Sequence, residues 1–274
     1  DLSYKTDGSF ELNSDLDSAL KNMKEFFKNG NVATSNNIFC RNIFEKLSRD
    51  ETKRLDFKYN HPYKDLNKKL IGESAYKVYK ISEMCTEKAI SVTPSVDLCN
   101  QEILYTGLAN IDSFTGRASQ ILTPSNSIKS SVKYYEKGDV IFSKMRPELR
   151  KVVNIEFDNP GYVSSECTVF KVNEKIISPK LFSIILRSNL VFNQIDHKIS
   201  GIGRPRISIK DLRDVVIPIP PLEIQNQLEK EFDTAQENAL ILEEKARDLL
   251  KQAEQMKLES VENLAINFIG KSFE

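Results

Sequence analysis

The sequence predicts an α+β protein, in which a twisted, mainly β domain with short helices is followed by one long helix of the coiled-coil type. Between Val78 and Val172, short β-branched and aromatic runs alternate with Gly, Pro, Asn and Asp, which is typical of strands joined by turns. After Pro221 neither Gly nor Pro occurs until Gly270, so a single helix can run through that segment. The chain has 274 residues and is 40% hydrophobic, which is enough apolar material for a core.

The first fifty residues are expected to form a separate helical segment. Ser14 is a favoured N-cap residue, and apolar residues recur behind it at helical spacing until Gly30. A second helix is expected at Asn37–Leu47. Pro62 is suited to open a further short helix at Tyr63–Leu70. These features predict a domain boundary near residue 50.

The clearest predicted strands of the β domain are Glu102–Leu108, Asp139–Ser143, Lys151–Phe157 and Val163–Val172. Ser178 then supplies an N-cap with Pro179 at the first helical position, and the apolar spacing predicts a helix to about Ile199. A short apolar strand, Val215–Ile219, follows. Pro220 and Pro221 end that strand.

The long helix, predicted from Leu222 to about Phe268, carries an apolar seam with alternating steps of four and three residues. The seam consists of Leu228, Phe232, Ala235, Ala239, Leu242, Ala246, Leu249, Ala253 and Met256. This is the heptad spacing of helices that pack along their length. A helix of this extent spans on the order of 70 Å, which is too long to bury its seam against one compact domain. We therefore expect a partner helix; the alternative is a helix folded back on its own domain.

Composition limits the classes of protein and of site. No apolar stretch approaches the roughly 20 residues of a membrane helix, and the first residues carry no signal-peptide core, so a cytoplasmic location is expected. No two cysteines form a C-x-x-C pair, and His61 and His197 are the only histidines, so no metal site is predicted. Buried free thiols are the expected state of Cys40, Cys85, Cys99 and Cys167.

The formal net charge is zero, but the charge is divided unevenly along the chain. Residues 31–220 hold 29 Lys and Arg against 21 Asp and Glu, and the two ends hold the compensating acidic excess. A basic middle region suits a polyanionic partner, while the flanks suit a protein partner. A solvated surface with uneven charge is the alternative.

Basic residues gather in three predicted loops, one of which, Ser125–Tyr135, contains Lys133. Of the other two loops, one follows the predicted strand Asp139–Ser143, and one is stiffened by Gly201, Gly203 and Pro205. Arginine can donate two hydrogen bonds to a guanine edge, and lysine more often neutralises phosphate. The candidate DNA contacts are therefore Arg204, Arg206, Lys210, Lys144, Arg146, Lys133, Ser143 and Gly203. In the alternative interpretation, the arginines bond the carbonyls near Ile199 or pair with Asp211 or Glu166.

An ordered set of segments resembles the DNA-specificity subunits of type I restriction-modification systems, in particular one target-recognition domain and its trailing helix. The matching segments are Lys137–Pro147, Gly161–Phe170, Ser200–Ser208 and Asp211–Gln225. The resemblance covers residues 54–270. It implies a helical N-terminal segment at 1–50, a recognition domain at 54–221 and a spacer or dimerisation helix at 222–270.

The resemblance also implies a function. Such a module directs an adenine-N6 DNA methyltransferase to its target on double-stranded DNA, and S-adenosylmethionine binds in that methyltransferase rather than in this chain. The expected partners are DNA, a methyltransferase subunit or fused domain, a restriction subunit, and a second copy paired through the helix. The family plan has two recognition domains held apart by antiparallel helices, whereas this chain has one. The chain is thus either a half-subunit or the recognition end of a fused methyltransferase, whose tail residues 1–50 faintly resemble.

Catalytic motifs are missing from the sequence. A flipped adenine is gripped by an Asn/Asp-Pro-Pro-aromatic motif, and Pro220 and Pro221 lie between Ile219 and Leu222 instead. Arg204 follows Gly203 directly, unlike the strand, glycine and helix order of a nucleotide-binding loop. We expect no enzyme activity from this chain. The rival functions are a coiled-coil protein-interaction module with an incidental basic head, and the recognition end of a bifunctional restriction-methylation enzyme.

Overall fold

The computed structural model describes residues 56–270, together with Arg54 and short N-terminal stretches at positions 2–4, 10–12, 21, 24, 25 and 28. Within those stretches, strand β1 (Leu2–Tyr4) pairs antiparallel with β2 (Phe10–Leu12). The helix expected at Asn37–Leu47, and most of the one expected between Ser14 and Gly30, lie outside the described residues. The expectation of a separate segment at 1–50 stays a prediction.

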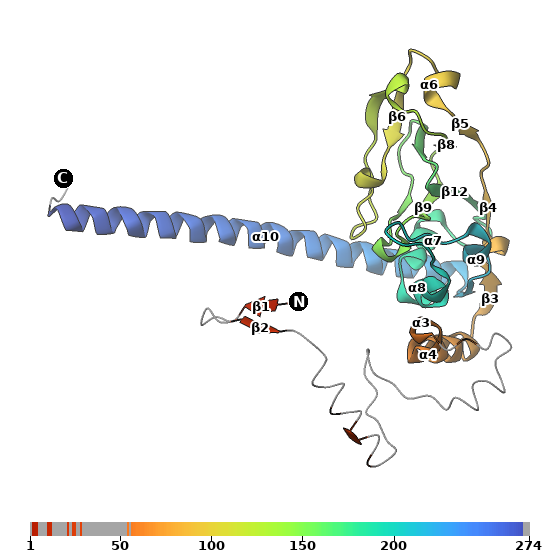
Figure 1. The fold of residues 1–274 in the computed structure, drawn as a ribbon, viewed down its shortest axis with the longest axis horizontal. Helices are drawn as coiled ribbons and strands as arrows, with labels where there is room; N and C mark the ends of the chain where they lie inside the picture. The colour runs from red at the N-terminus through yellow and green to blue at the C-terminus, as the bar shows by residue number, and fades with distance from the viewer. Residues whose placement is uncertain are drawn as a thin grey trace.

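The main body is an elongated β lobe standing on a helical base, and the long helix α10 (Leu222–Ile269) leaves from that base (Figure 1). One antiparallel sheet has the strand order β10 (Val152–Asn154), β9 (Asp139–Ser143), β12 (Cys167–Val172) and β4 (Cys85–Glu87). The other has the order β5 (Ser91–Val92), β8 (Val132–Tyr135), β11 (Gly161–Ser164), β6 (Glu102–Thr106) and β7 (Ile121–Pro124). The prediction of a mainly β domain is confirmed.

Strand β9 explains how the lobe joins the base. All five of its residues are buried. Alternate side chains of a strand point to opposite faces, and both faces of β9 are covered by a core. Val140 and Phe142 pack into the large core under the helices. Ile141 packs with Val163 and Val169 into a second core between the sheets. The loops at the end of β9 are therefore held by both cores.

The turn at Ser165 and Glu166 corrects one prediction. The run Val163–Val172 was expected to be a single strand, but it is divided between β11 and β12, which belong to different sheets. Serine can bond to nearby backbone and so favours turns, and Ser164 Oγ here accepts a hydrogen bond of 3.3 Å from Glu166 N. The turn places Glu166 at the edge between the two sheets.

The single helix predicted from Ser178 to about Ile199 is divided in the structure. Ser178 caps α7 (Pro179–Leu186) as predicted, with its side chain accepting from Leu181 N. The helix then stops, and α8 (Asn189–Ile195) begins after Ser188, whose backbone is extended. The break lets α8 turn onto α4 (Pro62–Gly72), where Asn67 Nδ2 donates to Leu190 O at 2.9 Å. Helix periodicity alone did not reveal this break.

Short elements complete the base and the lobe. Strand β3 (Lys77–Lys80) pairs antiparallel with β13 (Val216–Ile219), which confirms the short apolar strand. Within residues 56–270 the further short α-helices are α3 (Phe57–Asn60), α5 (Ile81–Met84), α6 (Pro94–Asp97) and α9 (Ile209–Arg213). The 3-10 turns are η1 (Leu108–Asn110), η2 (Ser125–Ser127), η3 (Pro147–Leu149) and η4 (Asp196–Lys198).

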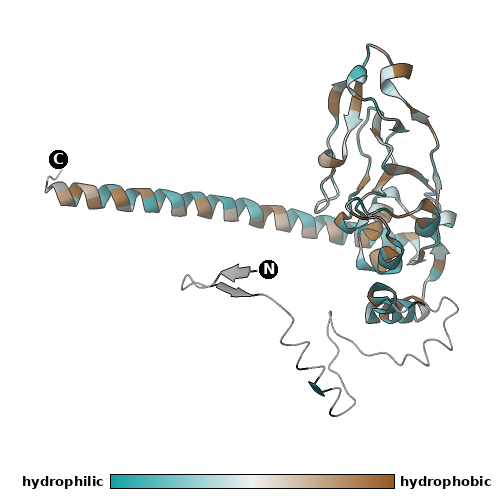
Figure 2. Cartoon of the chain, viewed as in Figure 1, coloured by the Kyte–Doolittle hydropathy of each residue, from teal (hydrophilic) through white to brown (hydrophobic). Residues whose placement is uncertain are grey.

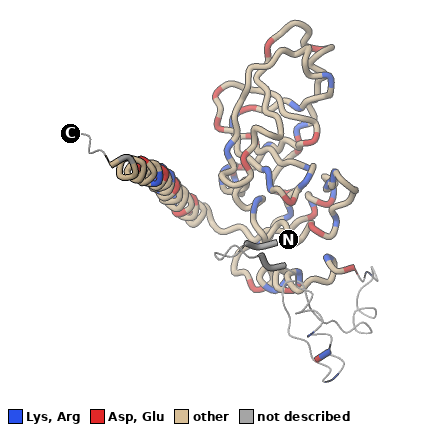
Figure 3. The backbone as a smooth tube through the Cα atoms, turned by 60° about the vertical axis from the view of Figure 1, so that its left-hand side comes forward, with Lys and Arg blue, Asp and Glu red and all other residues tan. Residues whose placement is uncertain are grey.

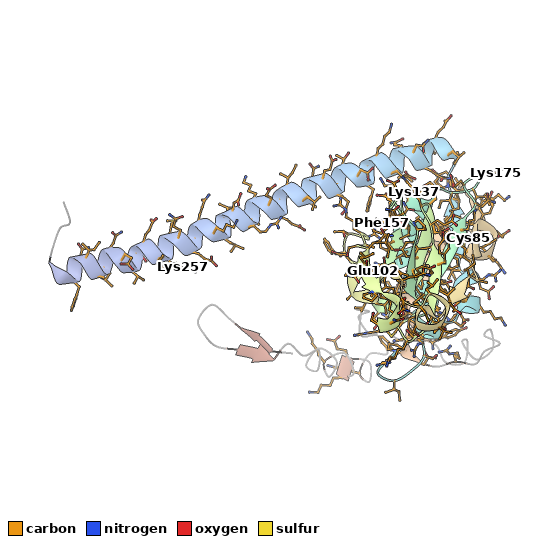
Figure 4. The ribbon with its side chains drawn as sticks, turned by 90° about the horizontal axis from the view of Figure 1, so that it is seen from above. Cys85, Glu102, Lys137, Phe157, Lys175 and Lys257 are labelled. Carbon is orange, nitrogen blue, oxygen red and sulfur yellow. The ribbon has the colours of Figure 1, made fainter. Side chains whose placement is uncertain are left out.

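Helix α10 (Leu222–Ile269) has 48 residues and confirms the predicted long helix. It begins behind Pro220 and Pro221, and apolar and polar residues alternate along its whole length (Figure 2). Seen from above, it projects far beyond the domain, with Lys257 near its distal end (Figure 4). Of the helices in the described part of the chain, none combines the length and apolarity needed to cross a membrane.

Candidate nucleic-acid interface

The loop after η4 forms a finger on the surface, which we define as residues 200–206. Ser200 and Arg206 close its base with two backbone hydrogen bonds, Ser200 N to Arg206 O at 3.0 Å and Arg206 N to Ser200 O at 2.7 Å. Gly201 and Gly203 have φ angles of 108° and 76°, a backbone conformation that favours glycine. A Cβ at Gly201 would also lie 3.0 Å from Arg204 O. The two glycines are therefore required by the shape of the finger.

The finger is bound to the loop that follows β9. Arg146 N donates to Pro205 O at 2.7 Å, and Ile207 N donates to Lys144 O at 3.1 Å. Met145 and Arg206 form an isolated antiparallel bridge. Two of the basic segments predicted from the sequence, which lie about sixty residues apart, are thus brought together as one surface. Because the loop after β9 is held by both cores, this surface has a rigid support.

Arg206 is held by Glu166. Its Nε and Nη2 donate to the two carboxylate oxygens at 2.9 and 2.6 Å, a fork-to-fork pair. These hydrogen bonds, with the charge of Arg206, lower the pKa of Glu166 although burial opposes the shift. For Arg206, the structure therefore has the ion pair with Glu166 that the sequence left open as an alternative to DNA contact. In this state Arg206 positions the finger, and its Nε and Nη2 are already engaged by Glu166.

Two other candidates are also satisfied within the protein. Ser143 is buried, and its Oγ donates to Met145 O at 2.7 Å, so it supports the turn and does not face a ligand. Lys133 Nζ donates to Glu87 Oε1 at 2.8 Å, and Thr168 Oγ1 donates to the same oxygen at 2.9 Å. Only 13% of the Lys133 side chain is exposed. Lys144 lies close enough to Lys133 and Glu87 to interact with both charges, which the sequence did not reveal.

Lys144 lies between the satisfied groups and the open surface. Its side chain is half-buried, and burial followed by repulsion from Lys133 lowers its pKa. Glu87 and Glu166 oppose that shift. An anion that approached Lys144 would stabilise its charged form, since opposite charges favour ionisation.

Three cations are exposed beside the finger. Arg204 is exposed, and within the described part of the chain its guanidinium has no ion pair or side-chain hydrogen bond. Lys210 is exposed on the first turn of α9, which is capped by Ser208. Arg146 is exposed and has a contact of 3.3 Å with Glu148. Basic and acidic residues intermix over the domain as a whole (Figure 3).

Comparison with known families identifies the family of the chain. A family model described as the type I restriction modification DNA specificity domain matches residues 73–252, which is more than half of the chain. The chain belongs to this family. The match includes the finger, the loop after β9 and the proximal part of α10.

Individual relatives have the same description. The chain is 29% identical over 165 residues to the type I restriction enzyme EcoDI specificity subunit of Escherichia coli, covering 60% of this chain and 34% of the relative. It is 26% identical over 136 residues to the HindI specificity subunit of Haemophilus influenzae, covering 48% of this chain and 27% of the relative. The matched part is about a third of the length of these relatives.

Solved structures share the fold. The HsdS subunit from Thermoanaerobacter tengcongensis superposes with a TM-score of 0.54 at 23% identity, covering 74% of this chain and 52% of that one. A chain from work on complex assembly and conformational transition of the type I R-M system gives a TM-score of 0.53 at 20% identity, covering 70% and 47%. A β domain with a long trailing helix is thus an architecture already seen in this family.

The first turns of α10 are locked onto the specificity domain. Gln225 is buried, and its Nε2 donates to Ile176 O at 2.8 Å and to Pro220 O at 2.9 Å. Ser178 bonds Glu229, and Lys180 Nζ lies 2.6 Å from an oxygen of Asp233. These contacts come from the segment before α7 and from α7 itself. They determine the direction in which the helix leaves the domain.

Beyond these contacts the seam is open to solvent. Every residue from Leu240 to Ala265 is exposed, and Leu242, Leu249 and Met256 are 66%, 55% and 69% exposed. Leu228 is 41% exposed, and Phe232 and Ala239 are half-buried. A helix folded back along its own domain is not what the structure has. The other predicted seam residues, Ala235, Ala246 and Ala253, lie on the same open face.

The cysteines of the described residues are all free thiols. Cys85 and Cys167 are buried free cysteines whose pKa burial raises to about 12, as expected for inert thiols. The expectation of burial is wrong for Cys99, which is exposed, and Cys40 lies outside the described residues. The described ranges hold no group of three or more His, Cys, Asp or Glu side chains that could bind a metal ion.

Proposed function

We propose that this chain recognises a specific sequence in double-stranded DNA and directs a DNA methyltransferase of a type I-like restriction-modification system to it. The observation that carries the proposal is the joined surface of the finger and the loop after β9, on a chain of the DNA specificity family. Arg204, Arg146 and Lys210 would contact phosphates and base edges there. Phosphate contacts would supply much of the affinity, and the arginine contacts would select bases.

The chemistry would belong to a partner. S-adenosylmethionine would bind in a methyltransferase subunit or fused domain, where adenine N6 would be methylated, and a restriction subunit would join the same assembly. This chain would contribute sequence choice and spacing. Because its substrate is genomic DNA, the assembly would act in the cytoplasm. The exposed seam of α10 would pair with the helix of a second copy or of a second recognition unit.

Salt dependence of duplex binding tests the proposal. The logarithm of the association constant should fall linearly with the logarithm of salt concentration, at about 0.9 per phosphate contact. The double variant Arg204→Ala with Arg206→Ala should bind more weakly and with a shallower slope, while its thermal unfolding remains cooperative. Arg247→Ala removes an exposed charge on the distal helix and serves as the control.

The target itself comes from sequencing methylated sites in the host. Loss of those sites on deletion of the coding sequence, with restoration by the wild-type chain, is the expected result. A folded wild-type chain with no salt-sensitive affinity for duplex DNA would favour the protein-interaction alternative.

A further inference from the structure

The tip of the finger is an apolar side chain, Ile202, that the protein leaves fully exposed, at 106% of its reference area. Its neighbours on both sides are Gly201 and Gly203, which have no side chains of their own. A Cβ at Gly203 would meet nothing within 4 Å. Ile202 therefore stands alone on a narrow projection. In the sequence, the two glycines that flank Ile202 within a basic loop could have indicated this residue. Apolar periodicity does not identify it.

The base of the projection is rigid although its tip is free. The pair Ser200 and Arg206 closes the loop with two hydrogen bonds, and Arg146 N bonds Pro205 O. The fork from Arg206 to Glu166 ties the same base to the turn between β11 and β12. Holding an apolar group on a stiff support reduces the entropy lost when that group is buried by a ligand.

The surroundings of Ile202 indicate what buries it. Arg204 and Arg146 are exposed next to the finger base, and Lys210 follows it on α9. A ligand that satisfies these cations and also covers an isoleucine must combine anionic groups with an apolar interior. Stacked base pairs between two phosphate backbones have this composition. Apolar side chains that enter between base steps are an established mode of binding in other proteins.

We propose that Ile202 inserts as an apolar wedge at a base step of the target duplex while the neighbouring cations hold the phosphates. This rests on the proposed function and adds to it a residue that recognises the deformability of a base step. Steps that unstack easily would be favoured at this position, since the cost of opening a step depends on its sequence.

The test uses the wild-type chain, Ile202→Ser and Ile202→Leu, with Ile241→Ser on α10 as a matched loss of an exposed isoleucine. Ile202→Ser should lower affinity for the target duplex about 10- to 100-fold, the effect of failing to bury one such side chain. Its salt slope should equal that of the wild type, because no charge changes. Ile202→Leu and Ile241→Ser should bind like the wild type, and all variants should unfold at the same temperature.

Fluorescence identifies the wedge itself. In target duplexes that each carry one 2-aminopurine, wild-type binding should raise the emission at one step, and Ile202→Ser should abolish the rise. Equal affinity of Ile202→Ser and the wild type would overturn the wedge but leave the proposed function intact. In another outcome, Ile202→Ser loses affinity but the wild type raises the 2-aminopurine emission at no step. If replacing one thymine by uracil then lowers wild-type affinity by the same factor, Ile202 contacts a thymine methyl group instead. No duplex binding by the wild type would overturn both proposals.

Discussion

At the scale of single residues, partners inside the protein decide which charges are available. Arg204 and Arg206 look equivalent in the sequence. Among the described residues, however, Arg204 has no ion pair, whereas Arg206 is tied to Glu166 by two hydrogen bonds. The test in which both are replaced will therefore combine two effects. Loss of Arg204 removes a cation from the DNA surface. Loss of Arg206 loosens the base of the finger and leaves Glu166 as an unpaired acid beside it.

His197 makes stability depend on pH. Its side chain is only 8% exposed, and its Nδ1 has no hydrogen-bond partner within the described residues although Asp196 Oδ1 lies 3.5 Å away. Burial, with repulsion from Lys64, lowers the pKa of His197 from 6.5 to about 4. Between pH 6.5 and about pH 4, His197 therefore binds a proton in the unfolded chain but not in the folded chain. The free energy of unfolding consequently falls as the pH is lowered through this window.

The expected loss from this residue is about 3 kcal/mol between those limits. His197→Gln, which does not titrate, should show a flatter dependence of the free energy of unfolding on pH from 6.5 to 4. Urea denaturation at several pH values measures both proteins. Identical pH dependence in the two would mean that His197 is accessible to protons in the folded state.

At the scale of elements, helix α10 presents its seam without a cover. Leu242 and Ile241 are neighbours of nearly equal exposure, 66% and 62%, but they lie about 100° apart around the helix. Leu242→Glu should raise the dissociation constant for helix pairing by about 100-fold or more, because a carboxylate replaces a buried leucine on both sides of a symmetric pair. Ile241→Glu should leave pairing unchanged. Sedimentation of both variants checks this, and a wild-type monomer with an ordered helix would contradict the pairing.

The distal part of α10 refines the seam. Seven-residue spacing continued past Met256 reaches Ser260 and Asn263, yet exposed apolar residues persist at Val261, Leu264 and Phe268. A repeat of eleven residues connects Val261 to Leu228, Ala239 and Leu250, and Leu264 to Leu242 and Ala253, whereas Phe268 lies eleven residues after Lys257. Such a repeat of about 3.67 residues per turn favours a straight or right-handed pairing.

The two spacings differ at adjacent leucines of the helix. The seven-residue seam contains Leu249, and the eleven-residue seam contains Leu250, which are 55% and 65% exposed. Leu250→Glu should weaken pairing more than Leu249→Glu if the eleven-residue stripe forms the contact. The same sedimentation assay compares the two variants, and a larger effect from Leu249→Glu would restore the heptad seam as the full interface.

At the scale of the whole molecule, the domain that carries the finger (the reader) is attached firmly to helix α10 (the spacer). The finger is braced by the sheets, and Gln225 and Glu229 brace the helix against the same domain. Two paired copies would therefore hold two readers at a set separation. Linking two binding events raises affinity without new contacts when the geometry matches.

This arrangement predicts a dependence on the spacing of half-sites. The wild type should bind a duplex with both half-sites at the host spacing about 100-fold more tightly than a duplex with one. Inserting five base pairs between the half-sites should remove the gain, and so should Leu242→Glu. Titration of each protein with each duplex by fluorescence anisotropy measures the effect, and a gain that survives the insertion would show that the spacer is flexible.

The sequence by itself determined the elements whose signals are local. Glycine, proline and cap residues marked the strand β9, the cap at Ser178 and the start of α10, and a long run without breakers predicted the extent of that helix. The family resemblance likewise depended on ordered local segments. Each of these signals acts within a few residues, where backbone sterics and hydrogen bonds to neighbours decide the outcome.

Only the tertiary structure decided which residues meet. Glu87 pairs with Lys133, and Glu166 pairs with Arg206, although these partners are distant in sequence. Arg204 has no ion pair among the described residues. The break between α7 and α8, and the split of the run Val163–Val172, follow from packing against other elements. Exposure of Ile202 and of the α10 seam is also a property of the folded surface. Local propensity carries no information about such contacts, because they depend on how distant segments share one core.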